Sequence, residues 1–402
     1  MRKPFRLLLA TVCACMAALG GTVGYYNSTL PDSYYVRQGE TLSLHTTIPI
    51  ASVSTETAKP SSATTEVLPL SNSVSLRLFG LIPVKSVEIT AVDTPLVVPG
   101  GMPFGVKLLM DGVMVVGMGD VAASNGGECC PAEDAGIRVG DIVESVNNCT
   151  VSGNTAMQEA IAASDGHPVT IRLRRAGTSL TVSLLPVYSD TEQRYQAGMW
   201  VRDSTAGIGT ITFVEPDTGR FAGLGHPICD MDTGEIIPLS SGEVADVSIS
   251  GVVRGTEGCA GELQGHFTSA RTTGVLTCNN RYGVFGSLTE PADGMHAIPL
   301  GMKQDITAGA AQIYSTISGR EAKAYDIVIE DVDMNSTGTK NLIVRITDPD
   351  LLAATGGIVQ GMSGSPILQN GRLVGAVTHV FVNDPTRGYG IFAESMYESG
   401  RG

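Results

Sequence analysis

The pattern of apolar and polar residues divides the chain into one apolar run and a long series of short alternating segments. From Leu7 to Tyr26 the chain is uncharged and mostly apolar, which is long enough for a helix that spans a membrane. Residues 27–75 are rich in Ser and Thr and carry no period around 55–65, so we expect a linker or loose stalk. Alternation in 74–78 and 82–89 then predicts β-strands.

Residues 100–187 are predicted to alternate short strands with two helices. Strand patterns at 113–116 and 169–174 enclose a predicted short helix in 130–137 and a helix over 156–163. The run 138–147, with its Gly140-Asp141 turn before a buried strand, resembles the most diagnostic segment of PDZ domains. The resemblance implies that Pro103, Phe104, Gly105 and Val106 form the loop whose N–H groups bind a peptide's terminal carboxylate.

Residues 188–402 have almost no helical period. Short alternating segments recur between Gly-rich turns, which predicts a mainly β unit, either a sandwich or a pair of barrels. The expected strands are 208–214, 247–253, 273–276, 282–288, 311–317, 325–329, 342–346, 367–369 and 373–379. The whole pattern predicts four parts: a leader (1–29), a linker with an N-terminal β region (30–99), a PDZ domain (100–187) and a second unit (188–402).

Charge and composition narrow the possible partners and the compartment. The formal net charge is -14 and no basic run exceeds Arg174-Arg175, which argues against nucleic acid as a partner. Basic residues at 2, 3 and 6 precede the apolar run, so the chain after it is expected to cross the membrane. A retained membrane anchor and a cleaved signal peptide, cut near Ala18 or Gly20, both place residues 30–402 outside the cytoplasm.

Cysteine and histidine spacing gives no support for a metal site. Six cysteines follow the leader, so export makes disulfides possible without choosing their pairing. The pair His226-x-x-Cys229 lacks a second pair of ligands. We therefore expect neither a metal nor another cofactor.

The segment 356–367 contains the candidate nucleophile. Its core, Gly-Met-Ser-Gly-Ser-Pro over 361–366, resembles the sequence around the nucleophile of chymotrypsin-like serine peptidases. The resemblance implies Ser363 as nucleophile, with the N–H groups of Gly361 and Ser363 as oxyanion donors. The alternative is a simple Gly/Ser/Pro turn between strands.

A serine needs a base, and the base usually needs an acid that orients it. His226 is the preferred base because Gly225 and Pro227 place it on a tight turn that closes a predicted hairpin. His379 is the rival, unless it is a structural histidine. Asp348, at a strand end before a proline, is the candidate acid; Asp350 stays open, and Asp348 could instead cap a short helix.

Several segments together resemble the stage IV sporulation protein B peptidase family. They are Gly225-His226, 282–286, 355–367 and 375–391. The resemblance implies a chymotrypsin-like double β-barrel with His226 as base, Asp348 as acid and Ser363 as nucleophile. Two departures stand out: Asp348 lies only fifteen residues before Ser363, and Pro227 occupies a position where a small residue is expected.

The resemblance also implies a biological role. Members of that family are exported during endospore formation into the space between the forespore and mother-cell membranes. They cleave themselves and a membrane-bound regulatory protein, so that an intramembrane protease activates a late sigma factor. The expected partners are therefore a protein substrate in a membrane complex and a PDZ-bound peptide, including one from the same chain. The alternative is a catalytically silent PDZ-containing scaffold.

Overall fold

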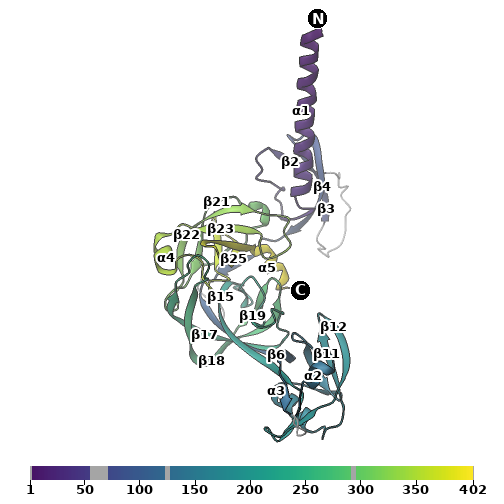
Figure 1. The fold of residues 1–402 in the computed structure, drawn as a ribbon. Helices are drawn as coiled ribbons and strands as arrows, with labels where there is room; N and C mark the ends of the chain where they lie inside the picture. The colour runs from purple at the N-terminus through teal and green to yellow at the C-terminus, as the bar shows by residue number, and fades with distance from the viewer. Residues whose placement is uncertain (1, 55–70, 123–126, 291–295, 402) are drawn as a thin grey trace, which may run out of the picture.

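The computed structural model describes residues 2–54, 71–122, 127–290 and 296–401. The protein is mainly β and is built from an N-terminal helix, a small sheet, two barrels and a PDZ domain. Helix α1 (Arg2–Thr29) projects from one end of the molecule, and the PDZ domain lies at the opposite end, beyond the barrels (Figure 1).

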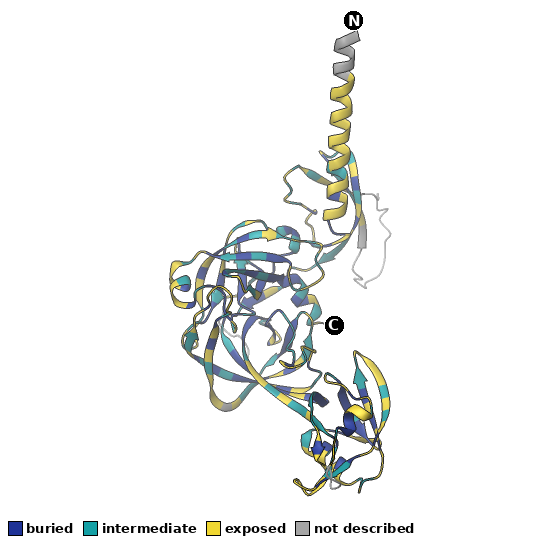
Figure 2. Ribbon diagram, viewed as in Figure 1, coloured by how far each residue is buried: buried dark blue, intermediate teal, exposed yellow. Residues whose placement is uncertain are grey.

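Helix α1 is the one described helix that is long and apolar enough to cross a membrane, over Leu9–Thr29. A signal sequence has the same properties, and from Leu9 onward most of α1 is exposed (Figure 2). After α1 the prediction of a loose stalk is wrong for much of its length. Instead β1 (Ser33–Arg37), β2 (Ile50–Ser54), β3 (Ser71–Leu78) and β4 (Ile82–Val92) form a sheet of order β1-β4-β3-β2. The Ser/Thr-rich segment at 55–65 lies outside the described residues.

The stalk prediction failed because this sheet takes its core from residues widely spaced along the chain. Tyr34, Leu42, Leu76 and Val87 are buried together although the sequence between them is polar. The sheet lies against the short helix η1 (Lys303–Asp305), where Arg37 pairs with Asp305 at 2.5 Å.

The first barrel is a ring of six strands. Its pairing order β6-β17-β18-β19-β16-β15 closes because β15 also pairs with β6. The strands are β6 (Pro103–Met118), β15 (Met199–Val214), β16 (Arg220–Gly223), β17 (Leu239–Val253), β18 (Glu262–Asn280) and β19 (Gly283–Leu288). Two short strands, β5 (Leu96–Pro99) and β20 (Ile298–Pro299), extend this sheet from β15.

The second barrel is closed and also has six strands, in the order β21-β22-β23-β26-β25-β24. Alternating residues such as Ile313, Ile329, Val344 and Ile367 fill its core and are fully buried. The strands and helices are β21 (Gly309–Ser315), β22 (Lys323–Val332), β23 (Leu342–Ile346), α4 (Pro349–Thr355), β24 (Pro366–Gln369), β25 (Arg372–Phe381), β26 (Asp384–Phe392) and α5 (Ala393–Ser399).

The PDZ domain grows out of the first barrel rather than standing before it. The outer parts of β6 and β15 pair with each other at 114–118 and 199–202, and β6 also pairs with β9. Its other elements are β7 (Val121–Ala122), β8 (Glu128–Cys129), α2 (Pro131–Asp134), β9 (Ile142–Val146), β10 (Cys149–Thr150), α3 (Asn154–Ala162), β11 (Val169–Arg175), β12 (Thr178–Leu184), β13 (Val187–Ser189) and β14 (Arg194–Gln196).

This arrangement corrects the role predicted for Pro103, Phe104, Gly105 and Val106. These residues lie in the inner half of β6, within the first barrel, where β15 pairs with one edge and β17 with the other. Phe104 is 2% exposed and packs edge-on against Phe221. A segment paired on both edges has no row of free N–H groups, so it cannot form a carboxylate-binding loop.

Candidate active site

Ser363 lies on a loop that is pressed directly against the first barrel. The next residue, Gly364, has φ +95°, and a Cβ there would overlap the carbonyl oxygen of Thr210 and the backbone nitrogen of Leu224. Only glycine allows both that conformation and that approach. The loop therefore holds Ser363 beside β15 and beside the turn that leads to His226.

Three carbonyl groups of the serine loop are bound by β15. The hydroxyl of Thr210 donates to Gly361 O at 2.8 Å, and the hydroxyl of Thr212 donates to Gly364 O at 2.8 Å. The N–H of Thr210 also donates to Ser363 O, at 3.3 Å. With its carbonyl oxygens fixed on one side, the loop can direct N–H groups to the other side.

Between Gln360 and Ser365, the N–H groups of Gly361 and Ser363 are the two without an acceptor among the described hydrogen bonds. The N–H groups of Gln360, Met362 and Gly364 all donate to backbone carbonyls. A buried or half-buried N–H without an acceptor is uncommon in proteins. Free donors at these alternating positions have the form of an oxyanion hole, which binds charge that develops in a transition state.

The turn before His226 is as tight as the sequence predicts. Leu224 and Gly225 follow β16, and both have left-handed backbone conformations, with φ of +66° and +70°. A Cβ on Gly225 would lie 2.9 Å from methyl groups of Thr378 and Ile391 in the second barrel. The turn therefore packs against β25 and carries His226 to the boundary between the barrels.

His226 and His379 lie together there. Their ring centroids are 5.1 Å apart, with an angle of 41° between the ring planes. Burial lowers the pKa of His226 below its ordinary value, although the Pro227 carbonyl acts in the opposite direction. Desolvation, the neighbouring His226 and the charge of Lys340 lower the pKa of His379 to about 4. Both imidazoles are therefore neutral at neutral pH.

The orienting contact of His226 is made within its own turn. Nδ1 lies 2.9 Å from the carbonyl oxygen of Pro227. Because a carbonyl can only accept, this contact fixes the proton on Nδ1 and leaves Nε2 as the basic nitrogen.

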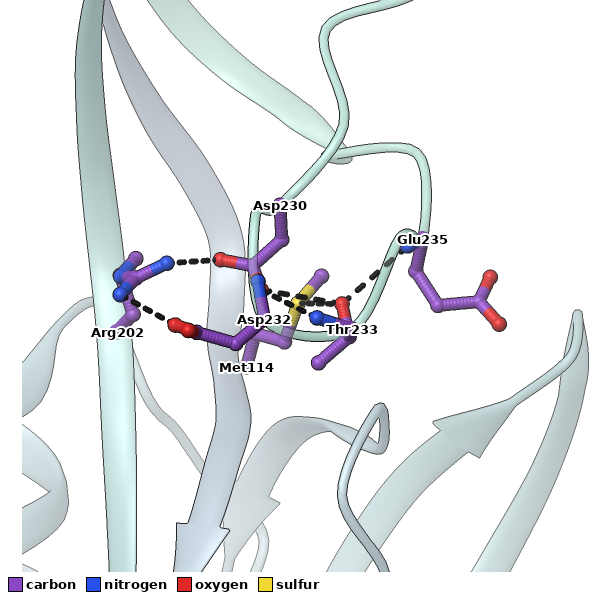
Figure 3. Close-up of polar contacts among 6 residues, drawn as sticks. All are labelled: Met114, Arg202, Asp230, Asp232, Thr233 and Glu235. Carbon is purple, nitrogen blue, oxygen red and sulfur yellow. Dashed lines mark hydrogen bonds and ion pairs between the residues drawn. The ribbon is translucent and has the colours of Figure 1, made fainter. Parts of the chain in front are cut away.

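The loop after His226 is fixed by side chains of β18 and β15. Asn279 bonds Ile228 N, Ile228 O and Ile237 O, all at 2.9 Å, and so ties the loop to β18. Arg202 on β15 pairs with Asp230 and, at 2.7 Å, with Asp232, while Asp230 also accepts two backbone N–H groups (Figure 3).

The charge of Asp230 depends on those contacts. Burial by itself raises the pKa of Asp230, whose side chain is fully buried. The N–H of Thr233, the guanidinium of Arg202 and the N–H of Asp232 act against burial and bring that pKa below its ordinary value. Asp230 is thus a charged anchor of the loop that carries His226.

In this structure the hydroxyl of Ser363 donates to Thr378 O at 2.7 Å. Thr378 directly precedes His379, and its own hydroxyl donates to Thr339 O at 2.9 Å. No hydrogen bond joins the hydroxyl of Ser363 to either imidazole within the described part of the chain. The serine loop, His379 and His226 nevertheless meet at one boundary.

Asp348 has a different place. Its carboxylate caps α4, accepting the N–H groups of Asp350 at 3.0 Å and Leu351 at 2.9 Å, and it accepts Asp326 N at 3.3 Å. Across residues 2–54, 71–122, 127–290 and 296–401, no hydrogen bond links a carboxylate to His226 or His379. The structure thus favours the alternative reading of Asp348 as a helix cap, and Asp350 contributes only its backbone N–H to that cap.

The PDZ domain contains a separate cavity of about 270 Å³. It lies between α3, represented by Met157 and Ile161, and the start of β15, represented by Met199 and Trp200. We name it the α3 groove. It lies away from Pro103 to Val106, and Trp200 at its edge is 69% exposed.

Sequence reasoning missed the residues that fix the serine loop. Thr210 and Thr212 are buried polar positions inside an apolar strand, and Thr378 is buried beside His379. Buried hydroxyl groups need partners, so threonines inside a predicted core strand were the available signal. The Pro227 carbonyl gave no signal, because every residue carries a carbonyl group.

Comparison with family models identifies two parts of the chain. The family model for the SpoIVB peptidase S55 matches residues 193–397, and a model for a PDZ domain matches residues 124–175. No curated protein matches the chain. The peptidase match covers more than half of the sequence and contains Ser363, both histidines and the two free N–H groups. The chain belongs to the SpoIVB peptidase S55 family and is a serine peptidase that carries a PDZ domain.

Proposed function

We propose that the protein is a serine endopeptidase in which Ser363 is the nucleophile and His226 is the general base. The observation that carries this proposal is the pair of free N–H groups at Gly361 and Ser363, held on the serine loop beside the turn of His226. Such donors are needed where a carbonyl oxygen becomes negatively charged.

In the proposed reaction the Ser363 hydroxyl leaves Thr378 O and turns toward Nε2 of His226, which accepts its proton. The oxygen attacks the substrate carbonyl, and the resulting oxyanion is bound by the two free N–H groups. The imidazolium then donates its proton to the leaving amine, which gives an acyl-enzyme. His226 then takes a proton from a water molecule, and the water oxygen attacks the ester. Hydrolysis of the ester restores Ser363.

We further propose that the Pro227 carbonyl, rather than Asp348, orients the imidazole. A neutral carbonyl fixes the same tautomer as a carboxylate does, but it stabilises the imidazolium less. The low pKa values of both histidines are consistent with a site that lacks a neighbouring negative charge.

The wider role follows from the family. We propose that the enzyme acts outside the cytoplasm, in the space between forespore and mother-cell membranes, with α1 as its membrane anchor or signal. There it would process itself and cleave a membrane-bound regulatory protein, so that an intramembrane protease activates a late sigma factor. The α3 groove is the proposed site for a peptide, including one from its own chain.

A fluorophosphonate probe tests the catalytic proposal, because it reacts only with an activated serine. We expect the full-length protein to be labelled at Ser363, and Ser363→Ala and His226→Ala to be unlabelled and to lose self-cleavage. His379→Ala serves as the matched imidazole control and should keep labelling. Labelling that survives His226→Ala and disappears with His379→Ala would transfer the role of base to His379. A folded but unlabelled wild-type protein would support the silent scaffold instead.

A further inference from the structure

The first barrel has an opening beside the serine loop. Strand β15 pairs with β16 only from Ile211 onward, and β18 pairs with β19 only from Gly274 onward. Over 204–209 and 264–267, the described strands pair with these two segments on one side only, through β6 and β17. Each segment therefore presents one open edge, and such an edge can accept a further strand.

A cavity of about 510 Å³ lies between the two open edges. Ala206, Gly207 and Ile208 line it from β15, Gly265 and Phe267 line it from β18, and Gly361 lines it from the serine loop. We name this cavity the open-edge groove. Because Gly361 carries one of the free N–H groups, the groove begins at the candidate oxyanion hole.

One of these edges already accepts an extended chain. Gln360 N–H donates to Gly261 O at 2.8 Å, and Leu263 N–H donates to Gln360 O at 2.9 Å. Gln360 thus forms a parallel bridge with Glu262 at the point where the groove begins. Beyond Leu263 the same edge of β18 continues without a described strand partner.

We propose that the open-edge groove binds the part of a polypeptide substrate that follows the scissile bond, as an extended strand added to one of these edges. The inference rests on the proposed function, since it takes Ser363 and His226 as the reacting pair. His226 must donate its proton to the leaving amine, and it follows β16 of the first barrel. The leaving half of the substrate therefore lies toward that barrel, where the groove lies.

The residues that line the open-edge groove indicate which substrate would fit it. The β15 side is made of small residues, so a backbone can approach closely, while Ile208 and Phe267 offer apolar contacts. Glu262 is the one charged residue of the lining. The groove is suited to an unfolded or strand-like segment without acidic side chains, and a helical segment cannot supply the unpaired backbone groups.

Gly207→Trp tests this proposal, because a Cβ at Gly207 meets no atom within 4 Å and its φ is not positive. The new side chain would fill the groove without disturbing the barrel. Ser241→Trp is the matched control, since Ser241 is an exposed strand residue of β17 outside the groove. Substrates would be chosen by mass spectrometry of peptides cut from a proteome digest by the full-length protein in detergent.

For one cleaved sequence, two forms are compared: a peptide that continues four residues past the scissile bond, and the same acyl part on a coumarin amide. We expect Gly207→Trp to lower kcat/KM for the continued peptide at least about tenfold relative to the coumarin amide, because more than one backbone hydrogen bond is lost. Ser241→Trp should leave the ratio of the two rates unchanged. Methylation of single backbone nitrogens in the leaving half should slow wild-type cleavage at alternate positions only.

An unchanged ratio in Gly207→Trp, together with indifference to backbone methylation, would overturn the proposal while leaving the peptidase intact. Absence of fluorophosphonate labelling in the wild-type protein would instead overturn the proposed function and this inference with it. If Gly207→Trp fails to fold, the methylated peptides still decide the question on the wild-type enzyme.

Discussion

The two halves of the active site are positioned by different means. On the serine side, Gly364 lies against backbone atoms of Thr210 and Leu224, and β15 binds three loop carbonyls. On the histidine side, the loop after His226 is fixed by the side chains of Asn279 and Arg202. The close backbone approach at Gly364 leaves no space for another atom, whereas the side-chain contacts on the histidine side can be weakened one at a time. The serine side is therefore the rigid half and the histidine side is the adjustable half.

The largest effect is expected on the serine side, at Gly364. We expect Gly364→Ala to destabilise the protein by at least about 2–3 kcal/mol, because the new methyl group meets backbone atoms and φ is positive. Fluorophosphonate labelling should also be lost. Gly319→Ala is the control, since Gly319 has φ +67° but no atom within 4 Å of a Cβ. It should cost about 1 kcal/mol, measured by urea unfolding. Equal losses in the two variants would show that close packing at Gly364 is unimportant.

The adjustable half is tested at Asp230. Asp230→Asn removes the charge of a fully buried carboxylate that pairs with Arg202, so we expect a loss of about 1–3 kcal/mol and roughly tenfold slower labelling of Ser363. Asp232→Asn is the matched control, because its carboxylate is 51% exposed and pairs with the same guanidinium. Its effect should stay below about 1 kcal/mol. Normal labelling in Asp230→Asn would show that this anchor does not position His226.

Substitution of Asp348 distinguishes between its two candidate roles, helix cap and orienting acid. As a cap, Asp348→Ala should lower the free energy of unfolding by about 1 kcal/mol and leave peptidase activity within about twofold of wild type. As an orienting acid, the same change would lower kcat by about 10⁴-fold. Cleavage kinetics and urea unfolding on one preparation distinguish the two outcomes.

The smallest expected effect concerns pH. The pKa values of His226 and His379 are lowered in the folded protein, so the unfolded chain binds more protons between about pH 4 and pH 6.5. Stability should therefore fall as pH falls through that window. Activity should rise with a midpoint below pH 6.5, as His226 loses its proton. A midpoint above 6.5 would point to a carboxylate near the imidazole.

Sequence reasoning succeeded where local patterns decide the structure. The alternation at 208–214 and 342–346 identified strands of both barrels. The strands predicted at 367–369 and 373–379 are also present, joined at Asn370-Gly371, where both residues have left-handed backbone. The family resemblance is confirmed, and the serine loop and the turn of His226 do meet.

It failed where the decisive partner lies far along the chain. The sequence of residues 103–106 resembles a peptide-binding loop, but the segment is a barrel strand that pairs with β17, about 140 residues further along the chain. Asp348 is a different case, because sequence analysis left a helix cap as the alternative and the carboxylate accepts N–H groups only two and three residues along, from Asp350 and Leu351. A local sequence motif does not show which distant backbone group will form a hydrogen bond with a given oxygen or nitrogen.

The end of α1 merges into the folded part without a hinge. Tyr26, in its last turn, is buried with Leu30 against the N-terminal sheet, and Asn335 of the peptidase unit donates to Ser28 O at 3.1 Å. When α1 is retained in a bilayer, the catalytic boundary is held at a set height above the lipid surface. A peptide bond can then be cut only if it reaches that height, and release of α1 would remove this limit.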